Sequence, residues 1–272
     1  MFHPSPIVLN TGKPAGIQTE GPLDVALTGR MSDVKTQFID PEAGRIRYQD
    51  MKGSKDFEGY RDLAAGLRSF DLRSLAERKQ KLAFWINIYN SAVIDGVIEL
   101  RLERSVKEFP RFFDRVSYDI GGFLFSLNEM EHGILRGNRR PPYRLRRPFR
   151  SRDPRYGFAI VPPDPRVHFA LVCGARSCPP IAFYEAQQLD LQLDLAALSF
   201  INSPQVKILP ERRSALISMI FKWYKTDFGG SDEALVDLLL KYLDEGRKKD
   251  FLRDNRDLVR IRYQPYDWDL NG

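Results

Sequence analysis

The sequence is poor in cysteine and histidine, with two cysteines and three histidines among 272 residues. A disulfide-stabilised secreted scaffold has a much higher cysteine content, so that class is excluded. No run of roughly 18 apolar residues occurs, which excludes a membrane-spanning helix. Residues 1–21 lack a basic segment followed by an apolar one, so we expect no secretory signal. These absences predict a cytoplasmic protein without a membrane span, although the mature form of an exported protein would have the same features.

Composition places the chain among ordinary globular proteins. Hydrophobic residues make up 43% and aromatic residues 12%, which is sufficient for a well-packed core. A length of 272 residues fits one large domain or two small ones. The formal net charge of +6 predicts only weak attraction to anions, so we expect no specific binding of nucleic acid.

Hydrophobic periodicity predicts a single α+β domain over residues 25–272, preceded by a flexible arm over residues 1–24 that is rich in proline and glycine. Strands and helices interleave without a regular βαβ rhythm, which favours α+β over a doubly wound α/β fold. We expect strands at 45–51, 167–173, 206–209 and near the C-terminus, and a hairpin over 116–127 that turns at Gly121 and Gly122. We expect helices at 57–79, 80–102, 126–137, 182–202, 214–230 and 231–246.

The segment 80–102 is apolar almost all round, which predicts a buried central helix with its core over residues 82–100. We expect it to pack on a small mixed or antiparallel sheet that contains strand 167–173. Asn87 and Asn90 lie in one polar stripe of this helix, and a buried polar group left unpaired costs about 1–3 kcal/mol. Either these amides tie neighbouring loops to the core, or one of them faces a cleft and orients a histidine or holds a substrate carbonyl.

Two of the histidines fall in predicted secondary structure. His132 lies on a short helix, and Glu129 and Arg136 share its face. Glu129 also fits a capping box with a serine at the start of that helix. His168 lies in the predicted strand, where alternation places it on the face opposite Cys173, so direct contact between these two side chains is not expected. For each histidine the structural alternative is a hydrogen-bonded core residue.

The cysteines flank the turn CGARSCPP. Gly174 permits a positive φ directly after the predicted strand, and the proline pair at 179–180 stiffens the exit. Cys178 is therefore expected on a rigid loop, a common location for functional groups. Arg176 would favour the thiolate form of a neighbouring cysteine.

Four interpretations of the cysteines stay open. Cys178, or Cys173 as second choice, is a nucleophile with a histidine within hydrogen-bond reach. Alternatively, the two cysteines form a zinc site with His132 and His168. They could also form a disulfide, which a reducing compartment disfavours, or be two small buried apolar side chains.

Residues 136–155 form an arginine-rich segment with nine arginines and one acid, Asp153. Few aromatic residues interrupt the arginines, so the segment lacks the pattern of a platform that stacks nucleic-acid bases. It predicts either a surface for an acidic peptide or protein partner, or a solvated loop whose arginines pair with acids of the protein itself.

Several ordered segments carry a family resemblance: KLAFWINIYNSAVI, YDIGGFLFSLNEMEHGILRGNRRPP, DPRVHFALVCGARSCPPIAFY, WYKTDFG and YDWDLNG. From about residue 30 to the C-terminus, the chain resembles the domain-of-unknown-function family 547 (DUF547) in its stand-alone bacterial form. The resemblance implies no established activity. The resemblance also favours an exported protein more than the composition alone does, and an exported protein is more compatible with the disulfide interpretation of the two cysteines. The resemblance implies that the following residues occupy motif positions of the family: Asn87, Tyr89, Asn90, Glu129, His132, Arg136, Arg166, His168, Cys173, Cys178 and Pro179.

A buried helix on a sheet, with Cys, His and Asn available, is similar to papain-like and transglutaminase-like thiol enzymes, although those carry the nucleophile at the start of the central helix. We therefore predict a thiol-dependent hydrolase or acyltransferase that acts on an amide or ester and needs no cofactor. The alternatives are a non-catalytic binding module that uses residues 136–155 and a zinc-stabilised domain. The predicted nucleophile is Cys178 or Cys173, and the predicted base is His132 or His168. Asn87 or Asn90 would orient the base, and Glu129 is a further candidate for the catalytic group. Substrate binding is predicted for Arg136, Arg166 and Tyr89.

Overall fold

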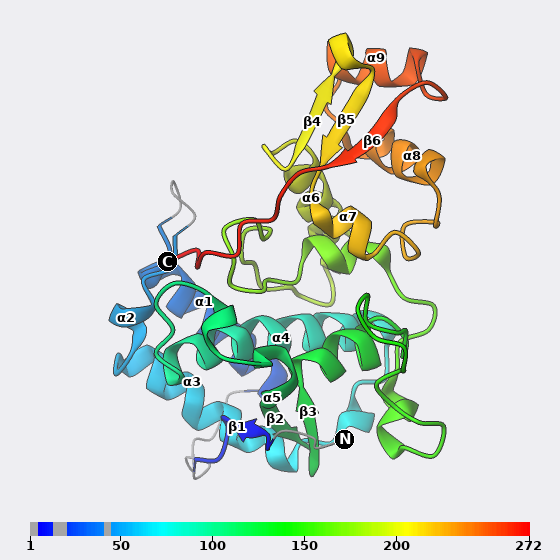
Figure 1. Cartoon of the computed structure of the whole chain (residues 1–272). Helices are drawn as coiled ribbons and strands as arrows, with labels where there is room; N and C mark the ends of the chain where they lie inside the picture. Colours follow the sequence, from blue (N-terminus) through cyan, green and yellow to red (C-terminus); the bar gives the residue numbers. More distant parts are fainter. Residues whose placement is uncertain (1–4, 13–20, 41–44) are drawn as a thin grey trace.

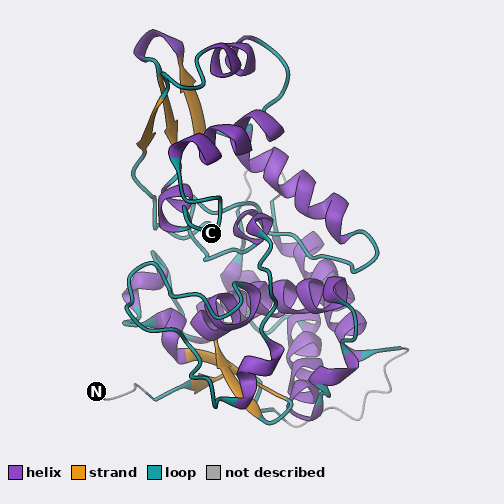
Figure 2. Ribbon diagram, turned by 90° about the vertical axis from the view of Figure 1, so that its right-hand side faces the viewer, coloured by secondary structure: helices purple, strands orange, loops and turns teal. Residues whose placement is uncertain are grey.

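The computed structural model describes residues 5–12, 21–40 and 45–272. The chain forms two packed parts, and the views in Figures 1 and 2 show the second above the first. The first part contains α1 (Leu23–Phe38), α2 (Tyr48–Met51), α3 (Lys55–Ala65), α4 (Arg78–Glu99), α5 (Phe112–Arg115) and strands β1 (Ile7–Val8), β2 (Val116–Ile120) and β3 (Phe123–Ser126). The second contains α6 (Leu189–Ile201), α7 (Met219–Trp223), α8 (Asp232–Tyr242), α9 (Arg247–Asp254) and strands β4 (Val206–Leu209), β5 (Ser214–Ile217) and β6 (Arg260–Tyr263). Short 3₁₀-helices cover Gly66–Ser69, Leu72–Ser74, Val106–Glu108, Pro154–Phe158, Pro165–Phe169 and Pro210–Arg212, and a π-helix covers Glu129–Leu135.

Each part holds one small mixed sheet, which confirms the α+β class. In the first sheet, β2 and β3 form an antiparallel hairpin and β1 pairs with β2 in parallel. In the second, β4 and β5 form the hairpin and β6 pairs with β5 in parallel. The first hairpin turns at Gly121 and Gly122, as predicted, with φ of 61° and 78°. Both values lie in the left-handed region, where glycine carries no steric penalty.

Helix α4 is the predicted central helix, and its side chains are buried from Leu82 to Ile98. It begins at a capping box in which Glu77 and Gln80 bond each other's backbone N–H groups. Helix α4 packs against α2, β2 and the π-helix. Gly96 lets this helix approach the sheet closely, because a Cβ there would lie 3.0 Å from both Phe112 and Val116.

The prediction of a strand over residues 167–173 is wrong. Asp164 caps a 3₁₀-helix over Pro165–Phe169, with Pro165 in its first turn. An Asp-Pro pair begins helical turns readily, since proline's fixed φ suits the first helical position. The residues after this helix join no sheet. Instead, the Asn90 side chain bonds the carbonyl of Ala170 and the N–H of Val172, which satisfies the backbone there.

Four other segments differ from the predictions, and in one of them helix α6 begins at Leu189 instead of at residue 182. Residues 45–51 form one bridge, between Ile46 and Ile39, and then the helical turn α2 instead of a strand. The helix predicted at 214–230 begins as strand β5, and only α7 is helical within it. Helix α3 ends at Ala65 and is followed by 3₁₀ turns, so the helix predicted at 57–79 is shorter.

The structure describes residues 5–12 and 21–24 of the predicted flexible arm. For residues 5–12 it differs from the prediction, because β1 pairs with β2 and Asn10 is buried. The Asn10 side chain donates to the carbonyls of Ala64 and Asp119 at 3.1 and 2.8 Å. Residues 1–4 and 13–20 lie outside the described residues.

Each part has its own hydrophobic core. The larger core surrounds α4 and includes Trp85, while the smaller one lies between the second sheet and α6 and α8 and includes Phe169 and Phe221. Within residues 5–12, 21–40 and 45–272, no helix has the length and apolar character needed to cross a lipid bilayer.

Candidate functional site

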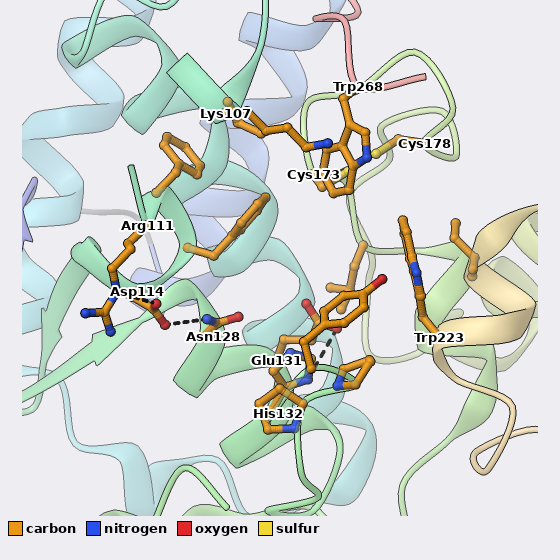
Figure 3. Close-up of a pocket in the computed structure, with 18 of the residues that line it drawn as sticks. Lys107, Arg111, Asp114, Asn128, Glu131, His132, Cys173, Cys178, Trp223 and Trp268 are labelled. Atoms are coloured by element: carbon orange, nitrogen blue, oxygen red, sulfur yellow. Dashed lines mark hydrogen bonds and ion pairs between the residues drawn. The ribbon is translucent and has the colours of Figure 1, made fainter. Parts of the chain in front are cut away.

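A cavity of about 440 Å³ lies between the two parts of the fold (Figure 3). Helix α4, the π-helix and residues 106–114 line it from the first part, and α7 and the C-terminal tail line it from the second. Its walls are rich in aromatic side chains, and its polar groups include both cysteines and two of the histidines. The aromatic residues that line the cavity are Tyr89, Phe109, Phe112, Phe113, Tyr143, Trp223, Tyr224, Tyr266 and Trp268.

The two cysteines lie together on one wall. The backbone N–H of Cys173 donates to the Sγ atom of Cys178 at 3.0 Å. The hydroxyl oxygen of Tyr266 lies 3.1 Å from the Cys173 sulfur and 3.2 Å from the Cys178 sulfur. Both thiols are free and both residues are partly exposed.

The C-terminal tail holds Tyr266 against this pair. It runs from β6 back to the first part (Figure 1) and bonds the cysteine loop along its path. Arg176 donates its N–H to the Asp269 carbonyl at 2.8 Å, and Asn271 donates to the Gly174 carbonyl at 3.0 Å. Gly174 has a φ of +80°, so its backbone adopts a conformation that glycine tolerates best.

These contacts give the two thiols different acidities. Burial by itself would raise the pKa of Cys178, but hydrogen bonds from the Cys173 thiol, the Tyr266 hydroxyl and the Cys173 backbone outweigh it and lower this pKa. The same hydrogen bond, together with burial, raises the pKa of Cys173 well above its usual value. Burial and the neighbouring thiols also raise the pKa of Tyr266, so its hydroxyl keeps its proton at neutral pH. Cys178 is therefore the more acidic of the two thiols.

A buried carboxylate, Glu131, lies at the other end of the cavity (Figure 3). The hydroxyls of Tyr224 and Tyr89 donate to its two oxygens at 2.6 and 3.3 Å. Burial opposes its charge, but the positive charge that His132 acquires in acid and the Tyr224 hydrogen bond outweigh burial and lower the pKa of Glu131. The cavity therefore has an anionic site at this end at neutral pH.

A second buried cluster surrounds Asp227. Its carboxylate accepts hydrogen bonds from Arg136 Nε at 2.6 Å, from Arg139 at 2.6 Å and from His168 Nε2 at 2.8 Å. The side chains of Arg136 and Asp227 are 3% and 1% exposed. Burial opposes the charge of Asp227, but the hydrogen bonds from His168 and Arg136 outweigh it and hold the pKa of this carboxyl far below its usual range.

Both histidines near the cavity are neutral at pH 7. Burial, with the Arg136 charge, lowers the pKa of His132 to about 4, and burial also lowers the pKa of His168. Because Arg136 can only donate, the Nδ1 atom of His132 accepts its hydrogen bond at 3.0 Å and the ring proton lies on Nε2. His168 donates from Nε2 to Asp227 and stacks on Tyr224 at 3.8 Å. Its Nδ1 atom has no hydrogen-bond partner within the described parts of the chain.

Comparison with known families gives one result: residues 72–201 match the family described as "Protein of unknown function, DUF547". This region belongs to the DUF547 family. No curated protein and no solved structure matches the chain. The DUF547 match ends before Tyr224, Asp227 and Tyr266, so part of the cavity lies outside the matched residues. Beyond 72–201, the resemblance from about residue 30 to the C-terminus stays a prediction, as does the analogy with papain-like and transglutaminase-like enzymes.

The structure brings six predicted site residues of the DUF547 region to the cavity or directly beside it. Five of them line the cavity, and Arg136 lies behind His132. Among the described residues, no hydrogen bond joins either histidine to either thiol, and Figure 3 shows the cysteines and His132 at different ends. The six residues are Tyr89, His132, Arg136, His168, Cys173 and Cys178.

Four predicted site residues lie elsewhere. Asn87 bonds the backbone of Tyr184 in both directions, and Asn90 bonds loop backbone as described above, so both amides tie loops to the core. Glu129 completes the capping box with the Ser126 backbone at 2.9 Å and pairs with Arg155 at 3.0 Å. Arg166 pairs with three acids, Asp164, Asp190 and Asp194, at 2.7, 2.9 and 3.2 Å.

The structure gives no support to the zinc interpretation. Across residues 5–12, 21–40 and 45–272, no three His, Cys, Asp or Glu side chains are grouped as metal ligands. His168 is bonded to Asp227 and His132 to Arg136, whereas Cys173 and Cys178 share Tyr266.

Several arginines of the segment 136–155 pair with the protein's own acids, which was one of the two interpretations of this loop. Arg139 bonds Asp227, Arg144 bonds Asp114 and Arg155 bonds Asp153. Use of this segment by an acidic partner stays a prediction.

Sequence reasoning missed Glu131, Tyr224, Asp227 and Tyr266. Glu131 directly precedes His132 in the sequence, and this spacing is no metal motif, so it gave no signal. The segments WYKTDFG and YDWDLNG, which carry the family resemblance, include these other three residues. This resemblance was the available signal, since no spacing rule connects residues so far apart in the chain.

Proposed function

We propose that this chain is a thiol-dependent hydrolase or acyltransferase with Cys178 as its nucleophile. One observation carries the proposal: Cys178 Sγ lies on the wall of the cavity and accepts a hydrogen bond from the Cys173 N–H at 3.0 Å, with the Tyr266 hydroxyl at 3.2 Å. Two donors at one sulfur favour the thiolate, which is the reactive form.

These contacts support the following reaction. The Cys178 thiolate attacks the carbonyl carbon of an ester or amide, and the C–S bond forms as the carbonyl oxygen becomes negative. Tyr266 lies beside the reacting sulfur and donates a hydrogen bond or proton to the departing alcohol or amine. Water or an acceptor amine or alcohol then attacks the thioester carbonyl, its proton returns to Tyr266, and the C–S bond breaks to release the Cys178 thiolate. The aromatic walls favour an apolar or aromatic acyl group.

The roles of the histidines change in this proposal. Each is hydrogen-bonded within the protein and neither is bonded to a thiol, so Tyr266 takes the place predicted for His132 or His168. His132 and His168 instead fix the positions of Arg136 and Asp227 behind the cavity.

The test is acylation with 4-nitrophenyl acetate, followed by mass spectrometry of peptides from the intact, folded chain. We expect an acetyl group on Cys178 and little on Cys173, which serves as the internal control in the same molecule. Cys178→Ser should abolish this thioester. Acetylation of Cys173 in preference to Cys178, or no acetylation of either thiol, would contradict the proposal.

Replacing Tyr266 with Phe should slow the alkylation of Cys178 by iodoacetamide at pH 7 by about tenfold. Loss of one hydrogen bond to a charged group raises the thiol pKa by about one unit, and one unit is a factor of ten in thiolate. In the wild type, alkylation should therefore reach its half-maximal rate at a lower pH than in Tyr266→Phe. The control is Tyr263→Phe, because the Tyr263 ring contacts Lys222 and neither sulfur. An unchanged pH profile in Tyr266→Phe would show that its hydroxyl does not stabilise the thiolate.

A further inference from the structure

Acyl transfer at Cys178 leaves the thiol of Cys173 without a chemical task. Yet the Cys173 sulfur lies 3.1 Å from the same hydroxyl oxygen that contacts the Cys178 sulfur. Both side chains also line the same cavity. We propose that the two cysteines form a reversible disulfide, and that the chain uses it for thiol–disulfide exchange with a small or peptide disulfide that carries apolar or aromatic groups.

The backbone of the cysteine loop, which the C-terminal tail holds in place, brings the two sulfurs together. The N–H of Cys178 donates to the carbonyl of Ala175 at 3.0 Å, which closes a turn between the cysteines. Gly174 allows the reversal through its positive φ. As a result, the Cys178 sulfur lies against the backbone nitrogen of Cys173 itself. Because both sulfurs contact one oxygen atom, rotation of the two side chains with an adjustment of this loop would bring them to bonding distance.

The exchange takes place in two balanced steps. The Cys178 thiolate attacks one sulfur of the substrate, so an S–S bond to Cys178 forms and the first substrate thiolate departs. The Cys173 thiol then loses its proton and attacks Cys178, which forms the internal disulfide and releases the second thiolate. The substrate takes up two electrons and, at neutral pH, protons from the cysteines and solvent, while the cysteine pair is oxidised. An external dithiol reverses the oxidation.

The structure also explains the order of the two steps. In the resting pair, the hydrogen bond to Cys178 and the charge there keep the proton on Cys173. Once Cys178 is bound to the substrate sulfur, it no longer carries the negative charge of a thiolate. The Cys173 thiol then loses its proton more easily. Cys173 becomes nucleophilic only after the first step, which is the behaviour of a resolving thiol.

The cavity indicates the class of substrate. Trp223, Tyr266 and Trp268 pack on one another beside the cysteines, with ring centroids 4.8–5.7 Å apart. The ammonium group of Lys107 lies 4.2 Å over the Trp268 ring, and it has no acidic partner among the described residues. An aromatic disulfide that bears a carboxylate fits these walls and this charge.

The test treats the folded full chain with 5,5′-dithiobis(2-nitrobenzoate), an aromatic disulfide with carboxylates. For the wild type we expect release of two chromophoric thiolates per chain and an intact mass lower by two hydrogens, with no adduct. Cys173→Ser should stop after one release and keep a mixed disulfide on Cys178. Cys178→Ser should react more slowly than Cys173→Ser. A wild-type chain that retains adducts on both cysteines, or on one alone, would overturn the inference.

The readouts separate this inference from the acyl function, which uses the same Cys178. A wild-type chain that forms the internal disulfide but never carries an acetyl group would support exchange and remove the acyl function. A chain that is acetylated on Cys178 but never forms the disulfide would remove exchange alone. Repeated consumption of the reagent in the presence of dithiothreitol, above the rate of the dithiol by itself and lost in Cys173→Ser, would establish turnover.

Discussion

Replacing Asp227 with Asn is expected to lower the free energy of unfolding by about 3–5 kcal/mol, the typical cost of breaking a buried ion pair by removing one partner. The amide keeps the shape of the carboxylate side chain but lacks its charge. Arg136, whose side chain is 3% exposed, would then be a buried cation without its carboxylate. His168 would lose the charged acceptor of its Nε2 proton, and burial leaves no water to replace it.

The control is Asp232→Asn, the same substitution a few residues away. Asp232 pairs with Lys225 at 2.6 Å, but its side chain is 52% exposed. Exposed pairs contribute about 0–1 kcal/mol, so this variant should be close to the wild type in urea denaturation. If both variants lost equally little stability, Asp227 would not hold the buried cluster together.

The same cluster predicts a dependence on pH. The pKa of Asp227 is lower in the folded chain than in the unfolded chain, so its charge contributes stability above the unfolded value of about 3.9, and this contribution is lost as the pH falls below it. The difference in unfolding free energy between the wild type and Asp227→Asn should therefore shrink below about pH 4. Denaturation curves of both proteins at neutral pH and at a pH below this value would measure it.

The sequence predicted those elements whose signals are local. Helix α4 is apolar along its length, and the β2–β3 hairpin turns at a glycine pair that tolerates a positive φ. The capping box of Ser126 and Glu129 depends on residues three apart. In each case a few neighbouring residues determine the backbone, so tertiary contacts do not change the outcome.

The predictions failed where distant residues decide the structure. The apolar run 167–173 has the composition of a buried strand, but Asn90 on α4 satisfies its backbone in place of a neighbouring strand. The stretch that begins at Ser214 has helical periodicity, yet its first residues pair with both β4 and β6. The alternation argument that separated His168 from Cys173 depended on the missing strand and loses its basis with it.

The sequence identified several residues of the candidate site but did not predict which of them contact one another. Cys178 and Cys173 were identified from their turn, and they do line the cavity. Their partner is Tyr266, which the C-terminal tail brings back to the first part of the fold. No periodicity links this tyrosine to a turn so far back in the chain, so only the three-dimensional structure could connect them.

Replacing Gly133 with Ala is expected to lower the free energy of unfolding by about 1–3 kcal/mol, the usual cost of overpacking a core. A Cβ at this position would lie 2.4 Å from Cε2 and 2.6 Å from Cζ of the Phe149 ring. The ring cannot simply move away, because Asn138 bonds the Phe149 backbone in both directions at 3.0 Å and Arg155 lies over its face at 4.7 Å. The helical preference of alanine, worth up to about 1 kcal/mol, offsets only part of this cost.

Gly29→Ala provides the matched control, since Gly29 lies inside α1 and a Cβ there would meet nothing within 4 Å. That variant should gain about 0.5–1 kcal/mol from helix propensity alone. Combining Gly133→Ala with Phe149→Leu should cost less than the sum of the single changes, because the smaller side chain removes the clash. Additive costs in this double variant would show that Phe149 is not what excludes a side chain at Gly133.

Gly133 matters to the cavity because of the helix that carries it. The N–H of Arg136 donates to the carbonyl of Glu131 at 2.8 Å, five residues back, which is the wide hydrogen-bond spacing of a π-helix. In this wide turn, the Glu131 side chain accepts a hydrogen bond from Tyr224, and the His132 side chain accepts one from Arg136. A displaced π-helix in Gly133→Ala would therefore move the anionic end of the cavity while the cysteine loop, held by the C-terminal tail, keeps its place. We accordingly expect Gly133→Ala to lower the free energy of unfolding while the rate of Cys178 alkylation stays close to that of the wild type. If the alkylation rate fell together with the stability, the two ends of the cavity would be mechanically coupled.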